Sequence, residues 1–190
     1  VNPELLNEKD QSTYRSIVGD LLYAANITRV DIAYIVNILA RYVNAPYNYH
    51  MSAARRVLQY LIGRTDKKLM FKGSMPNNDK SNSSKYTINI FTDASFGDDK
   101  SDRKSTCGWI STLNKNNVLA WQSKKQSTVA LSTTEAELYS LCEAVKEGLF
   151  MKQWFEYYVK LTPKIIISGD NQGSLYIGYS HPILLHQGTC

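Results

Sequence analysis

Residues 86–95 read YTINIFTDAS and form the stretch that decides the fold. Apolar Tyr86, Ile88 and Ile90 alternate with the other side chains, and this period of two is typical of a strand with one buried face. Its apolar part ends at Asp93, which is followed by small and polar residues. A carboxylate at the end of an apolar strand is costly to dehydrate unless a cation or hydrogen-bond donors meet it. Alone, Asp93 is more simply explained as a turn cap, so its interpretation depends on acidic residues further along the chain.

Two further strands are predicted directly downstream, at residues 107–113 and 118–121. The Asn-rich residues between them are typical of a tight turn, so the three strands are expected to form an antiparallel meander. A basic loop, SKKQST at residues 123–128, follows the meander.

A helix is predicted from Ser132 to about residue 159, with an interruption near Gly148. Ser132 and Glu135 have the spacing of a capping box, in which the serine accepts from the Glu135 amide and the Glu135 side chain reaches back. This gives Glu135 a structural role. Glu137, two residues further, is then free to face elsewhere from the start of the helix.

A short continuous apolar run follows, KIIISGD at residues 164–170, and such a run is typical of a central buried strand. It ends with Asp170, and residues 171–174 are expected to open another helix. A meander, a helix and a buried strand together predict an α/β domain with a mixed sheet over residues 86–190.

Three acidic residues, Asp93, Glu137 and Asp170, therefore share one end of the predicted domain. Clustered carboxylates repel one another unless hard divalent cations neutralise them, and Mg²⁺ suits such sparse carboxylate coordination. Two such ions can activate water and stabilise the leaving oxygen of a displacement at phosphorus. From spacing alone, this phosphodiester chemistry is one interpretation among several.

The residues before the meander predict a small helical subdomain. An amphipathic helix spans residues 12–26 with Ser12 as its N-cap, and a second helix opens at Thr28. A third helix ends at Gly63, and its apolar side chains are expected to face inward, namely Ala54, Val57, Leu58, Leu61 and Ile62.

The predicted domain boundary follows this helical part. Residues 68–72 are expected to form a short strand, which completes a subdomain over residues 1–73. Residues 74–85 are polar, rich in Asn and Ser and without periodicity, and we interpret them as a linker.

Composition narrows the functional classes. A chain of 190 residues with 43% hydrophobic residues can build a real core, and its net charge of +5 permits a polyanionic partner. The three cysteines, an odd number without CxxC spacing, indicate reduced thiols rather than a disulfide framework or a zinc site. No apolar run approaches the roughly 18 residues that span a bilayer.

Four segments, FTDAS, DRKSTCGW, WQSKKQSTVALSTTEAEL and GDNQGS, resemble in order the signature segments of the ribonuclease H domain of copia-type LTR retrotransposon Pol polyproteins. Residues 14–42 and 53–64 look like the thumb and connection region of the reverse transcriptase that precedes it. The resemblance implies a ribonuclease H-like fold and Mg²⁺-dependent hydrolysis of the RNA strand of RNA/DNA hybrids. The polymerase motif Y-x-D-D is absent, so DNA synthesis is not expected.

The resemblance also implies roles for individual residues. Asp93, Glu137 and Asp170 match the catalytic carboxylates, each expected to bind Mg²⁺ or Mn²⁺. The resemblance implies that Ser132, Thr133, Thr134 and Gln172 contact nucleic acid. Lys124 and Lys125 of the basic loop are expected to contact phosphates. The implied partners are an RNA/DNA hybrid and the remainder of the Pol protein, in a cytoplasmic virus-like particle or in the nucleus.

In one respect the chain departs from the family pattern. The family continues with a strand, a histidine and a fourth catalytic aspartate, whereas this chain stops after SHPILLHQGTC. We therefore expect the final strand, the final helix and the fourth carboxylate to be missing, and the open sheet edge to invite pairing with another chain. A catalytically inactive, truncated or repurposed hybrid-binding or scaffold fragment stays as the alternative. His181 and His186 are interpreted as surface residues.

Overall fold

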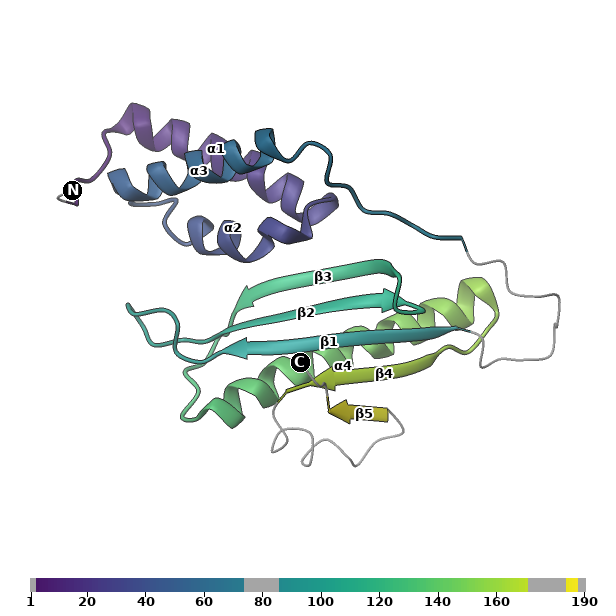
Figure 1. Cartoon of the computed structure of the whole chain (residues 1–190). Coiled ribbons are helices and arrows are strands. Elements are labelled where there is room, and N and C mark those ends of the chain that lie inside the picture. The colour runs from purple at the N-terminus through teal and green to yellow at the C-terminus, as the bar shows by residue number, and fades with distance from the viewer. Residues whose placement is uncertain (1–2, 74–85, 171–183, 188–190) are drawn as a thin grey trace. The chain divides into compact units, whose positions relative to one another are not determined.

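The computed structural model describes residues 3–73 and 86–170, and the backbone of residues 184–187 (Figure 1). It divides into two compact units, Val1–Leu69 and Met70–Cys190. The first unit is helical, and the second contains a sheet and a long helix. No helix among the described residues is long and apolar enough to cross a membrane.

The helical unit is built from three α-helices around one apolar core. They are α1 (Glu8–Ile27), α2 (Ala33–Ala40) and α3 (Asn48–Gly63), and a short 3₁₀-helix, η1 (Val30–Ile32), precedes α2. The buried Tyr14 hydroxyl donates to the carbonyl of Leu39 at 2.8 Å, which joins α1 to α2. This burial, reinforced by the nearby Tyr42, raises the pKa of Tyr14 to about 12.

Several predicted boundaries in this unit are wrong. The first helix begins at Glu8 because the Asn7 side chain, not Ser12, accepts from a first-turn amide, that of Asp10, at 2.9 Å. Thr28 ends α1 instead of opening the next helix. Residues 68–72 are irregular and form no strand.

The second unit contains one five-stranded sheet in the order β3-β2-β1-β4-β5. The strands are β1 (Thr87–Ser95), β2 (Thr106–Leu113), β3 (Asn117–Lys125), β4 (Lys164–Gly169) and β5 (Leu184–Gln187). The first three strands pair antiparallel, while β4 runs parallel to β1 and β5 parallel to β4. The predicted α/β class with a mixed sheet is therefore confirmed.

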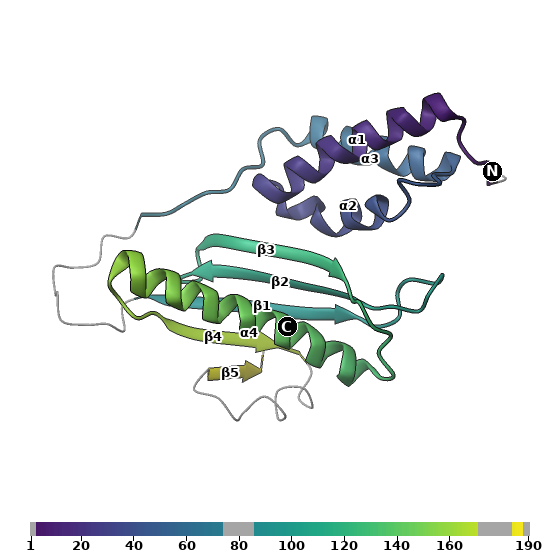
Figure 2. The ribbon, with the colours of Figure 1, turned by 180° about the vertical axis from the view of Figure 1, so that it is seen from behind.

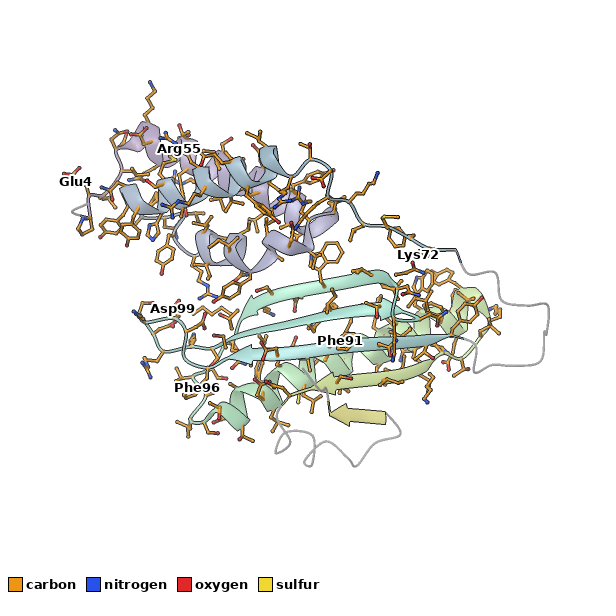
Figure 3. All side chains as sticks on the ribbon, viewed as in Figure 1. Glu4, Arg55, Lys72, Phe91, Phe96 and Asp99 are labelled. Atoms are coloured by element: carbon orange, nitrogen blue, oxygen red, sulfur yellow. The ribbon has the colours of Figure 1, made fainter. Side chains whose placement is uncertain are left out.

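In the described part of this unit, one long helix, α4 (Thr133–Trp154), covers one face of the sheet (Figure 2). It continues into one π-helical turn, η3 (Phe155–Val159). The core between helix and sheet is formed by buried aliphatic side chains, among them Ile88, Ile90, Leu141 and Ile167. Phe91, next to Ile90 on β1, projects instead from the other face of the sheet and is exposed (Figure 3).

The expected interruption near Gly148 is absent, and α4 runs through that residue. A Cβ at Gly148 would lie 3.1 Å from Ile165 Cγ2 and 3.2 Å from Ile90 Cδ1. The glycine thus lets the helix backbone lie close against the sheet, which is a packing role rather than a break.

A fifth strand lies beside β4, where the final strand is expected to be missing. Four residues near the end of the chain, Leu184–Gln187, form β5 and pair with β4 from Ile166 to Gly169. The sequence alone does not predict this strand, because a run of four residues is too short to show a strand period. Among the described residues, the edges of the sheet are therefore β3 and β5.

Candidate active site

The structure brings the three predicted carboxylates together. Asp93 lies near the end of β1, and Asp170 directly follows β4. Since β1 and β4 are parallel neighbours, their carboxyl ends lie side by side at the same end of the sheet. Glu137 reaches the same place from the beginning of α4. One carboxylate oxygen from each residue lies within 4.8 Å of the other two.

Glu137 is the buried member of this cluster. Its side chain is 8% exposed, and its Oε1 accepts from the Ala94 amide at 3.1 Å. Burial raises the pKa of Glu137 to about 7; the Ala94 amide opposes this rise, and the charges of Asp170 and Asp93 reinforce it. A carboxyl group in this state takes up a proton near neutral pH unless a positive charge arrives.

Glu135 has the structural role that the sequence predicts, with one difference in geometry. The Ser132 hydroxyl accepts from the Glu135 amide at 3.1 Å, as expected for an N-cap. The Glu135 carboxylate accepts from the amide of Leu131 at 2.7 Å, one residue earlier than in the standard capping box. The Glu135 amide and carboxylate thus stabilise the start of the helix.

A buried hydroxyl pair beneath the carboxylates was missed by the sequence interpretation. Ser140 Oγ lies 2.7 Å from the main-chain oxygen of Asp93 and 2.7 Å from Thr92 Oγ1. Ser140 is fully buried and Thr92 nearly so. A serine on the inward side of an amphipathic helix has no sequence signature of its own, so only the strand opposite reveals its role.

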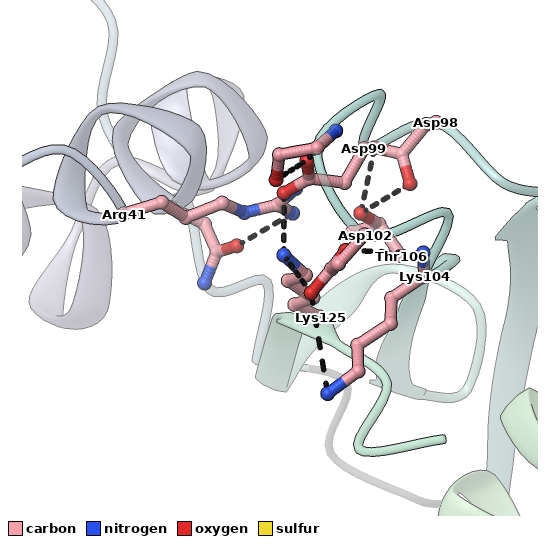
Figure 4. Close-up of polar contacts among 9 residues, drawn as sticks. Arg41, Asp98, Asp99, Asp102, Lys104, Thr106 and Lys125 are labelled. Carbon is pink, nitrogen blue, oxygen red and sulfur yellow. Dashed lines mark hydrogen bonds and ion pairs between the residues drawn. The ribbon is translucent and has the colours of Figure 1, made fainter. Parts of the chain in front are cut away.

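The two predicted phosphate contacts differ in their surroundings. Lys124 is exposed at the end of β3. Lys125 is half-buried and forms ion pairs with Asp99 and Asp102 of the β1–β2 loop (Figure 4). Hydrogen bonds from Lys125 and Ser101 hold the pKa of Asp99 well below its usual range.

For Lys125 itself, burial lowers the pKa, but the bonds to Asp99 and Asp102 outweigh burial and place its pKa above the usual value. The structure therefore gives this lysine a local structural role. The basic loop expected at residues 123–128 is in part strand, because β3 extends to Lys125.

The remaining predicted positions lie at or near the start of α4. Ser132 and Thr133 are exposed there, and Thr134 is half-buried. Gln172 and the helix expected to open at residue 171 lie outside the described residues, as does His181. His186 belongs to β5.

The cluster suits a hard divalent cation. Its donors are all carboxylate oxygens, which Mg²⁺ and Mn²⁺ prefer. Glu137 is buried, its hydrogen bond comes from a neutral amide, and its charged neighbours Asp93 and Asp170 are both acidic, so a cation would supply the opposite charge that this carboxylate needs. Asp93, Glu137 and Asp170 are the residues that would hold it.

Comparison with known proteins gives several relatives at 35% identity. The Retrovirus-related Pol polyprotein from transposon TNT 1-94 of Nicotiana tabacum matches over 162 residues, 85% of this chain and 11% of that protein. The Retrovirus-related Pol polyprotein from transposon RE1 of Arabidopsis thaliana matches over 173 residues, 88% of this chain and 11% of that protein. The chain thus spans about a tenth of the length of these Pol polyproteins.

A shorter relative has a different name. Secreted RxLR effector protein 161 of Plasmopara viticola is 35% identical over 138 residues, which are 73% of this chain and 90% of that protein. No protein-family model matches the chain.

Among solved structures, LC11-RNase H1 isolated from compost shares 13% identity, with a TM-score of 0.38 over 53% of this chain and 83% of that one. RNase H1 of Halobacterium salinarum shares 14% identity, with a TM-score of 0.35 over 50% of this chain and 65% of that one. Similarities this weak carry no functional argument.

Proposed function

Because this chain belongs to the family of retrovirus-related Pol polyproteins of copia-type transposons, we propose that its carboxylate cluster is the centre of a ribonuclease H-type nuclease. The proposed reaction is divalent-cation-dependent hydrolysis of the RNA strand of an RNA/DNA hybrid. Mg²⁺ is the proposed ion, and Mn²⁺ is a substitute with the same donor preference.

The convergence of Asp93, Glu137 and Asp170 is the observation that carries the proposal. These residues are far apart in the sequence, and their oxygens come within 4.8 Å only because the carboxyl ends of β1 and β4 and the start of α4 meet at the same end of the sheet. Three acidic groups placed together repel one another and reduce stability, so a cluster without a cation has no structural benefit.

Each protein group has a distinct task in the proposed site. Bound Mg²⁺ would act as a Lewis acid on the phosphodiester of the substrate. Exposed Asp93 and Asp170 present ligand oxygens on the solvent side, where a nucleic acid can approach. Buried Glu137, fixed by the Ala94 amide, presents its oxygen from the protein side and loses its proton when the cation arrives.

An RNA/DNA hybrid is proposed as substrate from the family resemblance and from the surface beside the cluster. Exposed Ser132 and Thr133 supply hydroxyls at the start of α4, the helix that carries Glu137, and a 2′-hydroxyl distinguishes the RNA strand of such a hybrid. Exposed Lys124 is the proposed phosphate contact. The helical unit is proposed to derive from the reverse transcriptase thumb and connection, and the rest of a Pol protein is the proposed partner, in a cytoplasmic particle or the nucleus.

A cleavage assay with two matched variants tests this function. A labelled RNA/DNA hybrid is incubated with the chain and Mg²⁺, alongside Glu137→Gln and Glu135→Gln. Glu137→Gln preserves the shape of the side chain but removes the charge of a proposed metal ligand. Mutating the partners of metal ligands costs about 10–100-fold in activity, so losing a ligand itself should reduce cleavage by at least about 100-fold. Gln at position 135 can still accept from Leu131, so cleavage should stay close to wild type. Equal losses in both variants would contradict the assigned roles.

A non-catalytic fragment is the second candidate function. It is favoured by the effector relative, since this chain covers 90% of a protein that carries no Pol name. A fragment of this kind should bind the hybrid equally well with Mg²⁺ and with EDTA, and leave it intact. Mg²⁺-dependent cleavage that disappears in Glu137→Gln would exclude it.

A further inference from the structure

Ser140 lies one helical turn beyond Glu137, so both side chains project from the same side of α4 toward the end of β1. Both are buried, Ser140 completely. The proposed function gives Ser140 no task, since a hydroxyl at this depth touches neither solvent nor substrate.

The hydroxyl has one hydrogen, and the distances indicate where it goes. Ser140 Oγ is 2.7 Å from the Asp93 carbonyl oxygen and 3.4 Å from that of Gly108. The shorter contact identifies Asp93 as the acceptor. The Ser140 oxygen then accepts from Thr92 Oγ1 at 2.7 Å, a shorter contact than the 3.3 Å from Thr92 Oγ1 to the Gly108 carbonyl.

The carbonyl of Asp93 and the amide of Ala94 belong to one peptide group. Ser140 binds the oxygen of this group, and Glu137 binds its N–H at 3.1 Å. Because a peptide group is planar, fixing both of its polar atoms fixes its orientation relative to α4. The Cα of Asp93, from which its carboxylate projects, is held with it.

We propose that Ser140 is a positioning residue, which sets the separation of the Asp93 and Glu137 carboxylates by holding the Asp93–Ala94 peptide group against α4. The proposal rests on the proposed function, because it concerns the same carboxylate site. A cation contacts both carboxylates at once, so its affinity depends on their separation. A hydroxyl that only stabilised the fold would not affect that affinity.

Ser111 offers a matched control on β2. It is also fully buried, and its hydroxyl lies 3.1 Å from the main-chain oxygen of Ala120. Ser111→Ala therefore removes a buried hydroxyl of the same kind that has no contact with the carboxylates. Thr92→Val provides a milder test, since it removes the donor to Ser140 and leaves the bond from Ser140 to Asp93.

The experiment measures Mn²⁺ affinity of the full chain by titration calorimetry, together with thermal melting without metal. Both serine variants should lower the melting temperature by similar amounts, because each loses a buried hydroxyl that donates one hydrogen bond and accepts another. Ser140→Ala should weaken Mn²⁺ binding about tenfold, which is typical when a residue that holds a metal ligand in place is replaced. Ser111→Ala should leave Mn²⁺ affinity within about twofold of wild type. Thr92→Val should weaken it less than Ser140→Ala.

The outcomes separate this proposal from the proposed function. Equal Mn²⁺ affinity in Ser140→Ala and Ser111→Ala overturns the positioning role while the cation site stands. A wild-type chain that binds no Mn²⁺ overturns the cation site and the positioning role together. If Ser140→Ala does not fold, as shown by the lack of a cooperative melt, Thr92→Val takes its place. A Thr92→Val chain that binds Mn²⁺ as tightly as Ser111→Ala overturns the proposal.

Discussion

Glu137 combines burial with a negative neighbourhood, and its protonation should therefore govern stability near neutral pH. Its pKa is about 7 in the folded chain and 4.5 as an isolated group. Between these values the unfolded chain has lost the proton that the folded chain keeps, so stability falls as pH rises from about 4.5 to 7. Below this window the carboxyl is neutral in both states and the penalty is absent.

The measurable consequence is a difference between wild type and Glu137→Gln in EDTA. Gln can still accept from Ala94 and carries no charge, so the variant should gain up to about 3 kcal/mol over wild type between pH 4.5 and pH 7.5. Titration of His50 and Glu147, whose pKa values are also shifted by burial, contributes equally to both chains and cancels. Denaturant unfolding at the two pH values measures the gain, and a gain independent of pH would contradict the assignment.

The adjacent lysines of β3 should separate binding from stability. Lys125→Gln removes the ion pair from Lys125 to the buried Asp99 carboxylate, so we expect a loss of about 1–3 kcal/mol in the free energy of unfolding. Lys124→Gln removes an exposed charge and should leave stability within about 0.5 kcal/mol. Its expected effect is weaker hybrid binding with a smaller salt dependence, measured by fluorescence anisotropy at several salt concentrations. The reverse pattern would show that the two roles are exchanged.

At the level of individual residues, the sequence predicts the carboxylates better than their supports. Asp93, Glu137 and Asp170 stand where a strand or a helix ends or begins, which are positions that the period of apolar residues locates. Ser140 stands inside a helix, and its partner is a main-chain oxygen 47 residues earlier. A hydrogen bond to a main-chain atom depends on how the chain folds and not on the type of residue that carries the atom. It therefore cannot be predicted from the spacing of side chains in the sequence.

Among the elements, α4 lies especially close to the sheet at Gly148. A Cβ there would meet Ile165 and Ile90, two buried strand residues that would have to give way by a few tenths of an ångström. Gly148→Ala should therefore destabilise the chain by about 1–2 kcal/mol, despite the better helix propensity of alanine. The measurement is a denaturant midpoint.

Gly19 provides the control for this substitution, because it lies within α1 and a Cβ added there would have nothing within 4 Å. Gly19→Ala should stabilise the chain by about 0.5–1 kcal/mol, since only the propensity gain remains. Stabilisation by both alanines would mean that helix and sheet have room to separate at Gly148.

The period of the apolar residues predicts which long helices and strands form. It does not predict where they begin and end, or where short strands form. The strands β1, β2 and β4 and the long helix were predicted within a few residues of their observed ends. Asn7 was missed as a cap, since Ser12 offered the same chemistry closer to the apolar pattern. β5 was missed because four residues form a strand only when a neighbour such as β4 supplies the partner.

For the whole molecule, cation binding should appear as added stability. A ligand that binds the folded chain alone stabilises it according to its concentration relative to its dissociation constant, about 1.4 kcal/mol at a tenfold excess. Millimolar Mg²⁺ or Mn²⁺ should therefore raise the melting temperature by several degrees. Glu137→Gln should show a reduced rise, and no rise in wild type would contradict the cation site.

The parallel pairing of β1 with β4 also has a consequence for the order of folding. Ile88 of β1 pairs in register with Ile165 of β4, and the whole meander and α4 lie between them in the chain. Contacts between residues so distant in sequence form slowly, because a long loop must close first, whereas the hairpins of β1, β2 and β3 close locally. During synthesis, Asp93 and Glu137 leave the ribosome before β4 exists. The carboxylate cluster is therefore a late product of folding, complete only when the last central strand has docked.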